Sequence, residues 1–204
     1  MNDLNTKTDL EFEAPTWDQM YSSLLNLAEI VKKSGFEPDL IVGVSRGGWI
    51  PARIMSDLLE NPNLATLTAE FYIGIAETRK EPSITQPVSV PVEGKKVLVV
   101  DDLADTGKSL KPVTSHLEKQ GASEVRTATI YYKPWSITVP DYYDMESRRW
   151  IVFPWEQKEA VKKIIEKFRR EGKTLEDAKG KLIRSGLKKE HVERFTKEIA
   201  EEER

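Results

Sequence analysis

The spacing of apolar residues predicts alternating helices and strands up to about residue 156. Residues 17–33 carry apolar side chains three or four positions apart, which is the period of an amphipathic helix. Residues 40–44 are almost continuously apolar, as in a strand that is buried on both faces. Residues 49–59 return to helical spacing after a glycine-rich turn. This part of the chain therefore begins with a helix, a strand and a second helix.

Further apolar segments continue the alternation. They predict strands over residues 67–75, 97–100, 125–131 and 150–153. The segment 77–91 is polar and contains prolines, so we expect a long loop there. Strands that alternate with helical segments predict an α/β fold, with a mainly parallel sheet flanked by helices. Ligands of such sheets bind outside the carboxyl ends of the strands.

After residue 156 the apolar pattern is helical throughout. Three apolar stripes predict three helices, and Thr174 with Asp177 has the spacing of a capping box that opens the second of them. We therefore expect one domain over residues 1–156 and a small C-terminal helical appendage over residues 157–204. The appendage has mixed charges, and we interpret it as a solvated helical cap or a contact between subunits.

The most informative segment is VLVVDDLADTGKSL, residues 97–110. Four apolar residues end in the adjacent acids Asp101 and Asp102, and Asp105 follows three positions later. The turn that follows contains Thr106, Gly107, Lys108 and Ser109, in which small hydroxyls and a permissive glycine lead into a helix. Backbone N–H groups at such a turn surround an anion, and a phosphate suits the position best. The acids would then lie beside the phosphate, where sugar hydroxyls or a magnesium ion would bind.

Two other interpretations of this segment are weaker. Gly107, Lys108 and Ser109 match the end of a P-loop, but the first glycine of that motif would fall on Asp102, whose carboxylate would repel phosphates. An ordinary strand followed by a polar helix cap is the other alternative. It accounts poorly for three acids around one turn, because these acids repel one another.

A second glycine turn lies at GVSRGGWIP, residues 43–51. Here a strand is followed by Ser45, Arg46, Gly47 and Gly48, and then by a helix. Paired glycines allow the backbone to approach an anion closely, and Arg46 adds a bidentate donor. A lone turn of this kind is weak evidence, because many strand-to-helix turns need glycine for geometry only.

These motifs resemble those of the type I phosphoribosyltransferases. The acid-acid-x-x-acid-Thr-Gly-x-Ser pattern is similar to their motif for 5-phosphoribosyl-1-pyrophosphate (PRPP). The segments VSRGG, IYYKPW and WIVFPWE, with Thr16-Trp17-Asp18 before them, resemble the xanthine-guanine and hypoxanthine-guanine members of that family. The resemblance runs in matching order from about Trp17 to Glu156, and it implies transfer of a phosphoribosyl group from PRPP to N9 of a 6-oxopurine.

The resemblance also implies a role for each site residue. PRPP would be bound by Ser45, Arg46, Gly47, Gly48, Tyr72, Asp101, Asp102, Thr106, Gly107, Lys108 and Ser109. Lys133 would donate to the purine 6-oxo group, Trp150 would stack on the ring, and Ile151 would offer backbone contacts. An ammonium group only donates hydrogen bonds, which suits a 6-oxo acceptor and disfavours the 6-amino group of adenine.

Catalysis and the metal follow from the same resemblance. Asp105 would lie near purine N7 as a general base or proton acceptor. Asp101, Asp102 and Glu156 would hold Mg²⁺, directly or through water. The chain departs from the family at Phe71-Tyr72, where the flexible loop of the family carries Ser-Tyr. Arg79 and Lys80 lie further along this loop and either reach the diphosphate or are solvated.

Composition narrows the class of protein further. The 204 residues contain 31 Lys and Arg against 34 Asp and Glu, so no overall basic charge points to nucleic acid. There is no cysteine, which excludes disulfides, thiolate zinc sites and a cysteine nucleophile. His116 and His191 are isolated, and we interpret both as structural or surface residues. No apolar stretch spans a bilayer and the first residues are polar, so we expect a cytoplasmic protein without a membrane partner.

The expected partners are PRPP and a purine base, and the resemblance implies a homodimer or homotetramer. Two alternative functions remain at this point. One is a regulatory protein that senses PRPP or a nucleotide without catalysis. The other is a phosphoribosyltransferase for another base, which would need different residues around the base.

Overall fold

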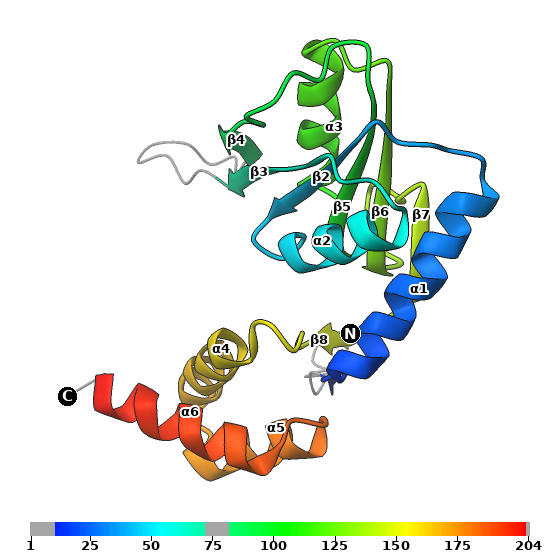
Figure 1. The fold of residues 1–204 in the computed structure, drawn as a ribbon. Helices are drawn as coiled ribbons and strands as arrows, with labels where there is room; N and C mark the ends of the chain where they lie inside the picture. The colour runs from blue at the N-terminus through cyan, green and yellow to red at the C-terminus, as the bar shows by residue number, and fades with distance from the viewer. Residues whose placement is uncertain (1–10, 72–81, 203–204) are drawn as a thin grey trace, which may run out of the picture. The chain divides into compact units, whose positions relative to one another are not determined.

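The computed structural model describes residues 11–71 and 82–202, and it divides the chain into two compact units (Figure 1). The sheet unit is Met20–Arg148, and the helical unit combines Met1–Gln19 with Arg149–Arg204. The predicted boundary after Glu156 falls inside the helical unit. The assignment of one domain to residues 1–156 and of a helical appendage to residues 157–204 stays a prediction.

The sheet unit is built around a mainly parallel sheet, which confirms the predicted α/β class. Its strands are β2 (Leu40–Ser45), β3 (Leu64–Phe71), β4 (Pro82–Gln86), β5 (Lys96–Ala104), β6 (Glu124–Tyr132) and β7 (Tyr142–Glu146). The described strands lie in the order β4-β3-β2-β5-β6-β7, and only β4 is antiparallel to its neighbour. The carboxyl ends of β2, β5 and β6 therefore lie side by side. We call this side of the sheet the carboxyl edge, and the opposite side the amino edge.

The continuous apolar run of β5 is explained by helices on both faces of the sheet. Val97 and Val99 belong to one apolar cluster together with residues of α3 (Leu110–Lys119). Leu98 and Val100 alternate with them, point to the opposite face and are completely buried as well. On that face lies α2 (Trp49–Leu58). A Cβ atom added to Gly43 of β2 would come within 2.9 Å of the Cβ atom of Ala52, so the helix and strand pack closely.

The predicted loop over residues 77–91 is wrong in part, because residues 82–86 form strand β4. This strand pairs antiparallel with β3, which supplies its backbone hydrogen bonds. It lies at the edge of the sheet, where a polar sequence that begins with proline is tolerated. Only Ile84 among its described side chains packs against the core. The preceding predicted strand begins at Leu64 rather than at residue 67, and its residues 72–75 lie outside the described residues.

The prediction for residues 150–153 is also wrong in part. Only Trp150–Ile151 forms a strand, β8, and it pairs in parallel with β1 (Phe12–Glu13) in a separate two-stranded sheet of the helical unit. The last described strand of the main sheet is instead β7, which the apolar pattern did not predict. Its five residues mix aromatic and acidic side chains, so that neither strict alternation nor a continuous apolar run marks it.

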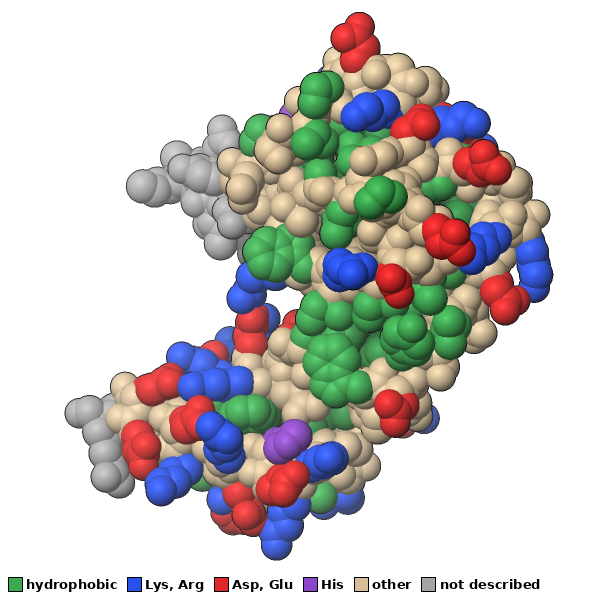
Figure 2. All heavy atoms as spheres, in the orientation of Figure 1, with side chains coloured by type: hydrophobic (Ala, Val, Ile, Leu, Met, Phe, Trp, Pro, Cys, Tyr) green, Lys and Arg blue, Asp and Glu red, His purple; other side chains and the backbone are tan. Residues whose placement is uncertain are grey.

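The helical unit contains three predicted helices, α4 (Gln157–Arg170), α5 (Leu175–Arg184) and α6 (Lys189–Glu202). Their apolar stripes form one core that also includes Phe12 and Val152. The capping box of α5 is confirmed, since the Thr174 hydroxyl accepts from the Asp177 N–H at 3.1 Å and the Asp177 carboxylate accepts from the Thr174 N–H at 2.9 Å. Basic and acidic side chains are interspersed on the face of this unit that Figure 2 shows.

A fourth helix, α1 (Trp17–Lys33), begins in the helical unit and continues in the sheet unit. In the sheet unit it buries an apolar stripe that consists of Met20, Leu24, Leu27, Ala28 and Val31. In the part of the chain that the structure describes, no helix is both long and apolar enough to cross a membrane.

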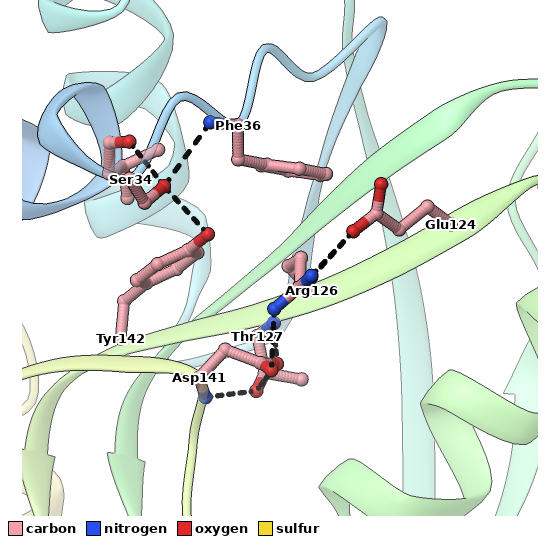
Figure 3. A network of polar contacts seen from close by, with 8 residues as sticks. Ser34, Phe36, Glu124, Arg126, Thr127, Asp141 and Tyr142 are labelled. Carbon is pink, nitrogen blue, oxygen red and sulfur yellow. Dashed lines mark hydrogen bonds and ion pairs between the residues drawn. The ribbon is translucent and has the colours of Figure 1, made fainter.

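The amino edge is closed by polar contacts between segments that are distant in sequence (Figure 3). The Asp141 carboxylate accepts hydrogen bonds from the N–H and the hydroxyl of Thr127, both at 2.8 Å. The Ser34 hydroxyl, after the end of α1, lies 2.9 Å from the Tyr142 hydroxyl at the start of β7. Arg126 pairs with Glu124, with a shortest distance of 2.7 Å between the charged groups. These contacts join the segment after α1 to the start of β7, and the loop before β7 to β6.

Candidate active site

Most of the predicted site residues of the sheet unit lie at its carboxyl edge. The turn 45–48 follows β2, the acids Asp101 and Asp102 lie in the last half of β5, and the turn 105–109 connects β5 to α3. Lys133 comes directly after β6. Because β2, β5 and β6 are neighbours and parallel, the topology alone brings these four segments to one edge.

The first turn is tightly folded against the strand that precedes it. The Gly48 N–H donates to the Val44 carbonyl at 2.8 Å, and the peptide bond between Ser45 and Arg46 is cis. Gly48 is the N-cap of α2 and has no side chain to accept from the first helical N–H groups. The Trp49 N–H donates to the Arg46 carbonyl of the same turn at 3.3 Å, and Pro51 carries no N–H group. A glycine turn that leads into the amino end of a helix is typical of anion-binding turns.

Gly47 brings this turn directly against the acids of β5. A Cβ atom at Gly47 would lie 2.6 Å from the Asp102 Cγ atom and would overlap its carboxylate oxygens. A side chain at position 47 is therefore excluded unless Asp102 moves. The structure thus places one predicted anion-binding turn in contact with one of the predicted carboxylates, although the two residues are far apart in sequence.

Asp101 and Asp102 differ in their surroundings. Asp101 is 8% exposed, and one of its carboxylate oxygens accepts from the Asp102 N–H at 2.9 Å. Burial raises the pKa of Asp101 well above its ordinary value, and the negative charge of Asp102 raises it further. Asp102 is half-buried. Two carboxyl groups at the end of one strand therefore share a site in which the negative charge of Asp102 opposes the ionisation of Asp101.

The second turn, residues 105–109, leaves its polar groups accessible. Asp105, Thr106 and Lys108 are exposed, and α3 begins after Ser109, whose side chain makes no capping hydrogen bond. Gly107 has φ +70°, which favours glycine. A Cβ atom there would also lie 2.6 Å from the Thr138 backbone nitrogen. The glycine is therefore required both by the backbone conformation and by a close neighbour.

That neighbour belongs to residues 133–138, a segment that follows β6 and runs beside the second turn. The Lys133 N–H donates to the Ala104 carbonyl at 3.0 Å, and the Ile137 N–H donates to the Thr106 carbonyl at 3.1 Å. The Thr138 hydroxyl donates to the Gly107 carbonyl, also at 3.1 Å. The conformation of the turn 105–109 is therefore stabilised by backbone and hydroxyl groups of residues 133–138.

Lys133 itself is 3% exposed, which is unusual for a lysine. Its Nζ atom lies 5.6 Å from the centroid of the Trp135 ring, within the range of a cation–π interaction. The indole of Trp135 also donates to the carboxylate of Asp105 at 3.1 Å. The predicted purine-binding lysine and the predicted proton acceptor therefore contact the same aromatic ring.

The remaining predicted purine and metal residues belong to the helical unit. Trp150 is 39% exposed and its ring centroid lies 6.1 Å from that of Phe12, while Ile151 is buried in β8. Glu156 is half-buried and is the N-cap residue of α4. The structure describes these residues within their own unit, and their roles toward a purine or a metal stay predictions.

Tyr72, Arg79 and Lys80 lie outside the described residues. The two histidines are separated from the carboxyl edge in sequence. His191 contacts Gln157 within the helical unit, where its Nδ1 atom lies 3.0 Å from Oε1, and His116 is half-buried in α3. Among residues 11–71 and 82–202, no group of three or more His, Cys, Asp or Glu side chains is arranged to hold a metal.

Sequence reasoning missed three residues at this edge, namely Trp135, Ser136 and Thr138. All three lie in the KPWSIT segment after β6. A signal was available, because a polar and aromatic segment directly after a parallel strand lies at the ligand-binding edge of the sheet. The segment IYYKPW was part of the resemblance, but the prediction gave a role to Lys133 alone.

Comparisons with known proteins agree with this architecture. The family model of the phosphoribosyl transferase domain matches residues 17–162. A xanthine-guanine phosphoribosyltransferase of Idiomarina loihiensis is 34% identical over 118 residues, which cover 57% of this chain and 70% of the relative. Another, of Gluconobacter oxydans, is 28% identical over 153 residues and covers 74% of this chain and 88% of its own length.

A solved structure supports the same assignment. The crystal structure of a purine phosphoribosyltransferase from Pyrococcus horikoshii superposes with a TM-score of 0.65 and 40% sequence identity, over 71% of this chain and 93% of that one. The mainly parallel sheet carries two glycine turns and paired carboxyl groups at its carboxyl edge, which is where ligands of such sheets bind. With the family match over residues 17–162, the chain belongs to the phosphoribosyl transferase domain family.

Proposed function

We propose that this protein is a purine salvage enzyme that transfers the 5-phosphoribosyl group of PRPP to N9 of a 6-oxopurine and releases diphosphate. The candidate purines are hypoxanthine, guanine and xanthine. The observation that carries the proposal is the carboxyl edge, where two anion-binding turns, two adjacent carboxyl groups and a buried lysine come together. The names of the similar proteins point to the same substrates.

The two turns suit the two ends of PRPP. The turn from Asp105 to Ser109, at the amino end of α3, binds the 5-phosphate through Thr106, Gly107, Lys108 and Ser109. The turn from Ser45 to Gly48, at the amino end of α2, binds the diphosphate, to which Arg46 adds positive charge. Asp101 and Asp102 lie between these turns in sequence and at the same edge, and they accept hydrogen bonds from the ribose hydroxyls. Tyr72 is proposed, from the resemblance alone, to help close the site.

The purine is selected by groups that complement a 6-oxo substituent. Lys133 donates to this oxygen, and its low exposure favours a partner that replaces water around the ammonium group. Asp105 accepts the proton of the purine or contacts N7. The roles of Trp150, as the stacking residue, and of Ile151, through its backbone, rest on the resemblance of the WIVFPWE segment.

We propose Mg²⁺ as the cofactor, held by Asp101 and Asp102 with Glu156 as a further candidate. The raised pKa of Asp101 reflects burial and repulsion from Asp102, and a divalent cation would relieve both effects. Mg²⁺ prefers oxygen ligands and is commonly held by one or two carboxylates together with substrate phosphates and water. This donor set fits an ion that arrives with the diphosphate. When bound, Mg²⁺ supplies charge neutralisation and orientation of the leaving diphosphate.

In the reaction, the bond between C1 of the ribose and the diphosphate oxygen breaks, and a bond from C1 to purine N9 forms. The bonding electrons leave with the diphosphate. N9 attacks through its lone pair while the imidazole proton of the purine is on N7, and this proton passes to an acceptor, for which Asp105 is the candidate. Positive charge develops on the ribose, near Asp101 and Asp102. Alignment of two bound substrates by separate subsites supplies a further part of the rate.

Location and assembly are part of the proposal. A cytoplasmic enzyme with PRPP and a purine as its small-molecule partners, without nucleic acid or membrane, agrees with the balanced charge of the chain. A homodimer or homotetramer is proposed from the resemblance to the family. Sedimentation of the full chain measures the assembly directly.

The test is an assay of the full chain with PRPP and each of hypoxanthine, guanine, xanthine and adenine, followed by ultraviolet absorbance. We expect turnover of at least one 6-oxopurine, none with adenine, and loss of turnover when EDTA removes Mg²⁺. Turnover of adenine alone would replace the proposal by a transferase for another base. Tight binding of PRPP without turnover of any base would favour a sensor protein.

A further inference from the structure

The indole of Trp135 donates a hydrogen bond to the side chain of Asp105. Its Nε1–H donates to the Asp105 Oδ1 atom at 3.1 Å. Trp135 is nevertheless 49% exposed, so that half of a large apolar side chain lies in solvent at this position. Burial of apolar surface therefore does not account fully for a tryptophan here, whereas a directed N–H donor does.

The backbone around Trp135 is fixed on both sides of Asp105. The Lys133 N–H binds the carbonyl of Ala104, the residue before Asp105, at 3.0 Å. The Ile137 N–H binds the carbonyl of Thr106, the residue after Asp105, at 3.1 Å. A bond of 2.9 Å from the Ser136 N–H to the Lys133 carbonyl closes a turn around Trp135. The indole thus projects from a segment whose backbone is hydrogen-bonded to the residues on either side of Asp105.

The chemistry of the indole suits a residue that orients a carboxylate without neutralising it. Tryptophan carries one N–H donor, no acceptor and no charge. A bond to Oδ1 fixes the plane of the Asp105 carboxyl group and leaves Oδ2 for a substrate. A lysine or arginine at the same place would pair with the charge of Asp105 and weaken it as a proton acceptor.

The same ring contacts the group that we assign to the purine 6-oxo oxygen. The Lys133 Nζ atom lies 5.6 Å from the ring centroid, so that the ammonium group faces the indole while the indole N–H faces Asp105. Lys133 and Asp105 come from different strand ends, after β6 and after β5. Trp135 is therefore placed to fix the spacing between the two groups.

We propose that Trp135 is a positioning residue that orients Asp105 toward the purine and fixes its spacing from Lys133. This proposal rests on the proposed role of Asp105 as the proton acceptor in phosphoribosyl transfer. It predicts that the effect of Trp135 on the reaction passes through Asp105. PRPP binding, which uses other residues, should be nearly independent of it.

The kinetic test compares Trp135→Phe with the wild-type protein. Phenylalanine keeps an aromatic ring and removes the N–H donor, so kcat with the best 6-oxopurine should fall about tenfold, which is the size of a lost hydrogen bond to a charged group. The KM for PRPP should stay within about twofold of the wild-type value, because the substitution removes no group that we assign to PRPP binding. Val139→Ala, at a position that is 58% exposed in the same connection, is the matched control and should leave kcat unchanged.

A double-mutant cycle tests whether the effect passes through Asp105. In the Asp105→Ala background, Trp135→Phe should cause no further loss of kcat, because the acceptor of the indole is already absent. Losses that multiply in the double variant, or an unchanged kcat in Trp135→Phe, would overturn the proposal. A fall in kcat with an equal rise in the KM for PRPP would also overturn it and indicate a distorted phosphate turn.

An NMR measurement tests the contact without turnover. The indole ¹H–¹⁵N signal of Trp135 is assigned by its loss in Trp135→Phe, and it should shift in Asp105→Ala but not in Val139→Ala. An unshifted signal would contradict the proposal even if the enzyme is active. If the wild-type protein transfers no phosphoribosyl group, the proposed function fails, and the indole signal still decides whether Trp135 is bound to Asp105.

Discussion

The carboxyl groups at the two edges of the parallel sheet have different surroundings. At the amino edge, Asp141 accepts two hydrogen bonds from Thr127 at 2.8 Å, and its other oxygen lies 3.6 Å from Arg126 (Figure 3). Asp39, before β2, likewise accepts from the Lys96 N–H at 2.8 Å. These carboxylates are satisfied by the chain itself. They join strands and loops that are distant in sequence.

At the carboxyl edge the acids are crowded instead. Asp101 and Asp102 are adjacent, and burial together with mutual repulsion raises the pKa of Asp101. A perturbed acid at a ligand-binding edge is a typical sign of a functional site. Carboxylates at the amino edge therefore join segments of the fold, whereas those at the carboxyl edge are crowded at the position where we propose that PRPP and a metal bind.

The strongest test of this contrast replaces both acids of the carboxyl edge. The variant Asp101→Asn with Asp102→Asn keeps the volumes and removes the charges, so kcat/KM should fall by at least about a hundredfold, as for other groups that stabilise a transition state electrostatically. The melting temperature should not fall, because repulsion and a buried charge are removed. Activity within a few-fold of the wild type would place the ribose and metal site elsewhere.

The next largest effect is expected at Lys133, which we propose to bind the purine 6-oxo group. Lys133→Met keeps a long side chain and removes the ammonium group, which should raise the KM for the 6-oxopurine by about ten- to a hundredfold, since a charged hydrogen bond is lost. The KM for PRPP should change little. Steady-state kinetics with each substrate varied in turn measures both values. Equal increases for the two substrates would remove Lys133 from the purine site.

At the amino edge we expect the reverse pattern, with a loss of stability but not of activity. Asp141→Ala leaves the buried Thr127 N–H and hydroxyl without their acceptor, which should lower the free energy of unfolding by about 1–3 kcal/mol. Asp141→Asn keeps one acceptor oxygen and is the matched control, with a smaller loss. Urea unfolding measures the stability. A large fall in kcat/KM below the melting transition would contradict the division between the two edges.

The smallest effect concerns the pH dependence of stability. Because the pKa of Asp101 is raised in the folded state, its neutral form favours folding, and this contribution is complete below the unfolded pKa of about 3.9 and is lost as pH rises through the folded pKa. In EDTA, Asp101→Asn should therefore be more stable than the wild type at neutral pH. The difference should shrink toward acid pH. A constant difference at all pH values would show that the charge of Asp101 is not the cause.

The sequence predicts those features of the site that depend on residues close together in the chain. The apolar run 97–100 with its following acids marks β5 and its carboxyl end, and the glycines at positions 47 and 107 mark the two turns. The structure shows why each of these positions requires glycine, which the sequence spacing did not reveal. Gly47 faces Asp102, and Gly107 faces the segment after β6. The family resemblance joined these local motifs into one function.

The features that could not be predicted depend on long-range pairing. Strand β4 is polar because it forms an edge, and β8 pairs with β1 from the opposite end of the chain, so neither has a local pattern that reveals its partner. The bond between Trp135 and Asp105 joins residues from the ends of two strands. It becomes visible only when the parallel register of β5 and β6 is known.

One measurement tests the central claim that the carboxyl edge carries out purine phosphoribosyl transfer. Wild-type protein, Asp141→Ala and the Asp101→Asn, Asp102→Asn double variant are each incubated with PRPP, Mg²⁺ and an equimolar mixture of the four purines, and the products are identified by mass spectrometry. We expect the wild type and Asp141→Ala to form 6-oxopurine nucleoside monophosphates with one diphosphate each, and the double variant to form none. Equal product from all three proteins, or adenine nucleotide alone from the wild type, would contradict the account.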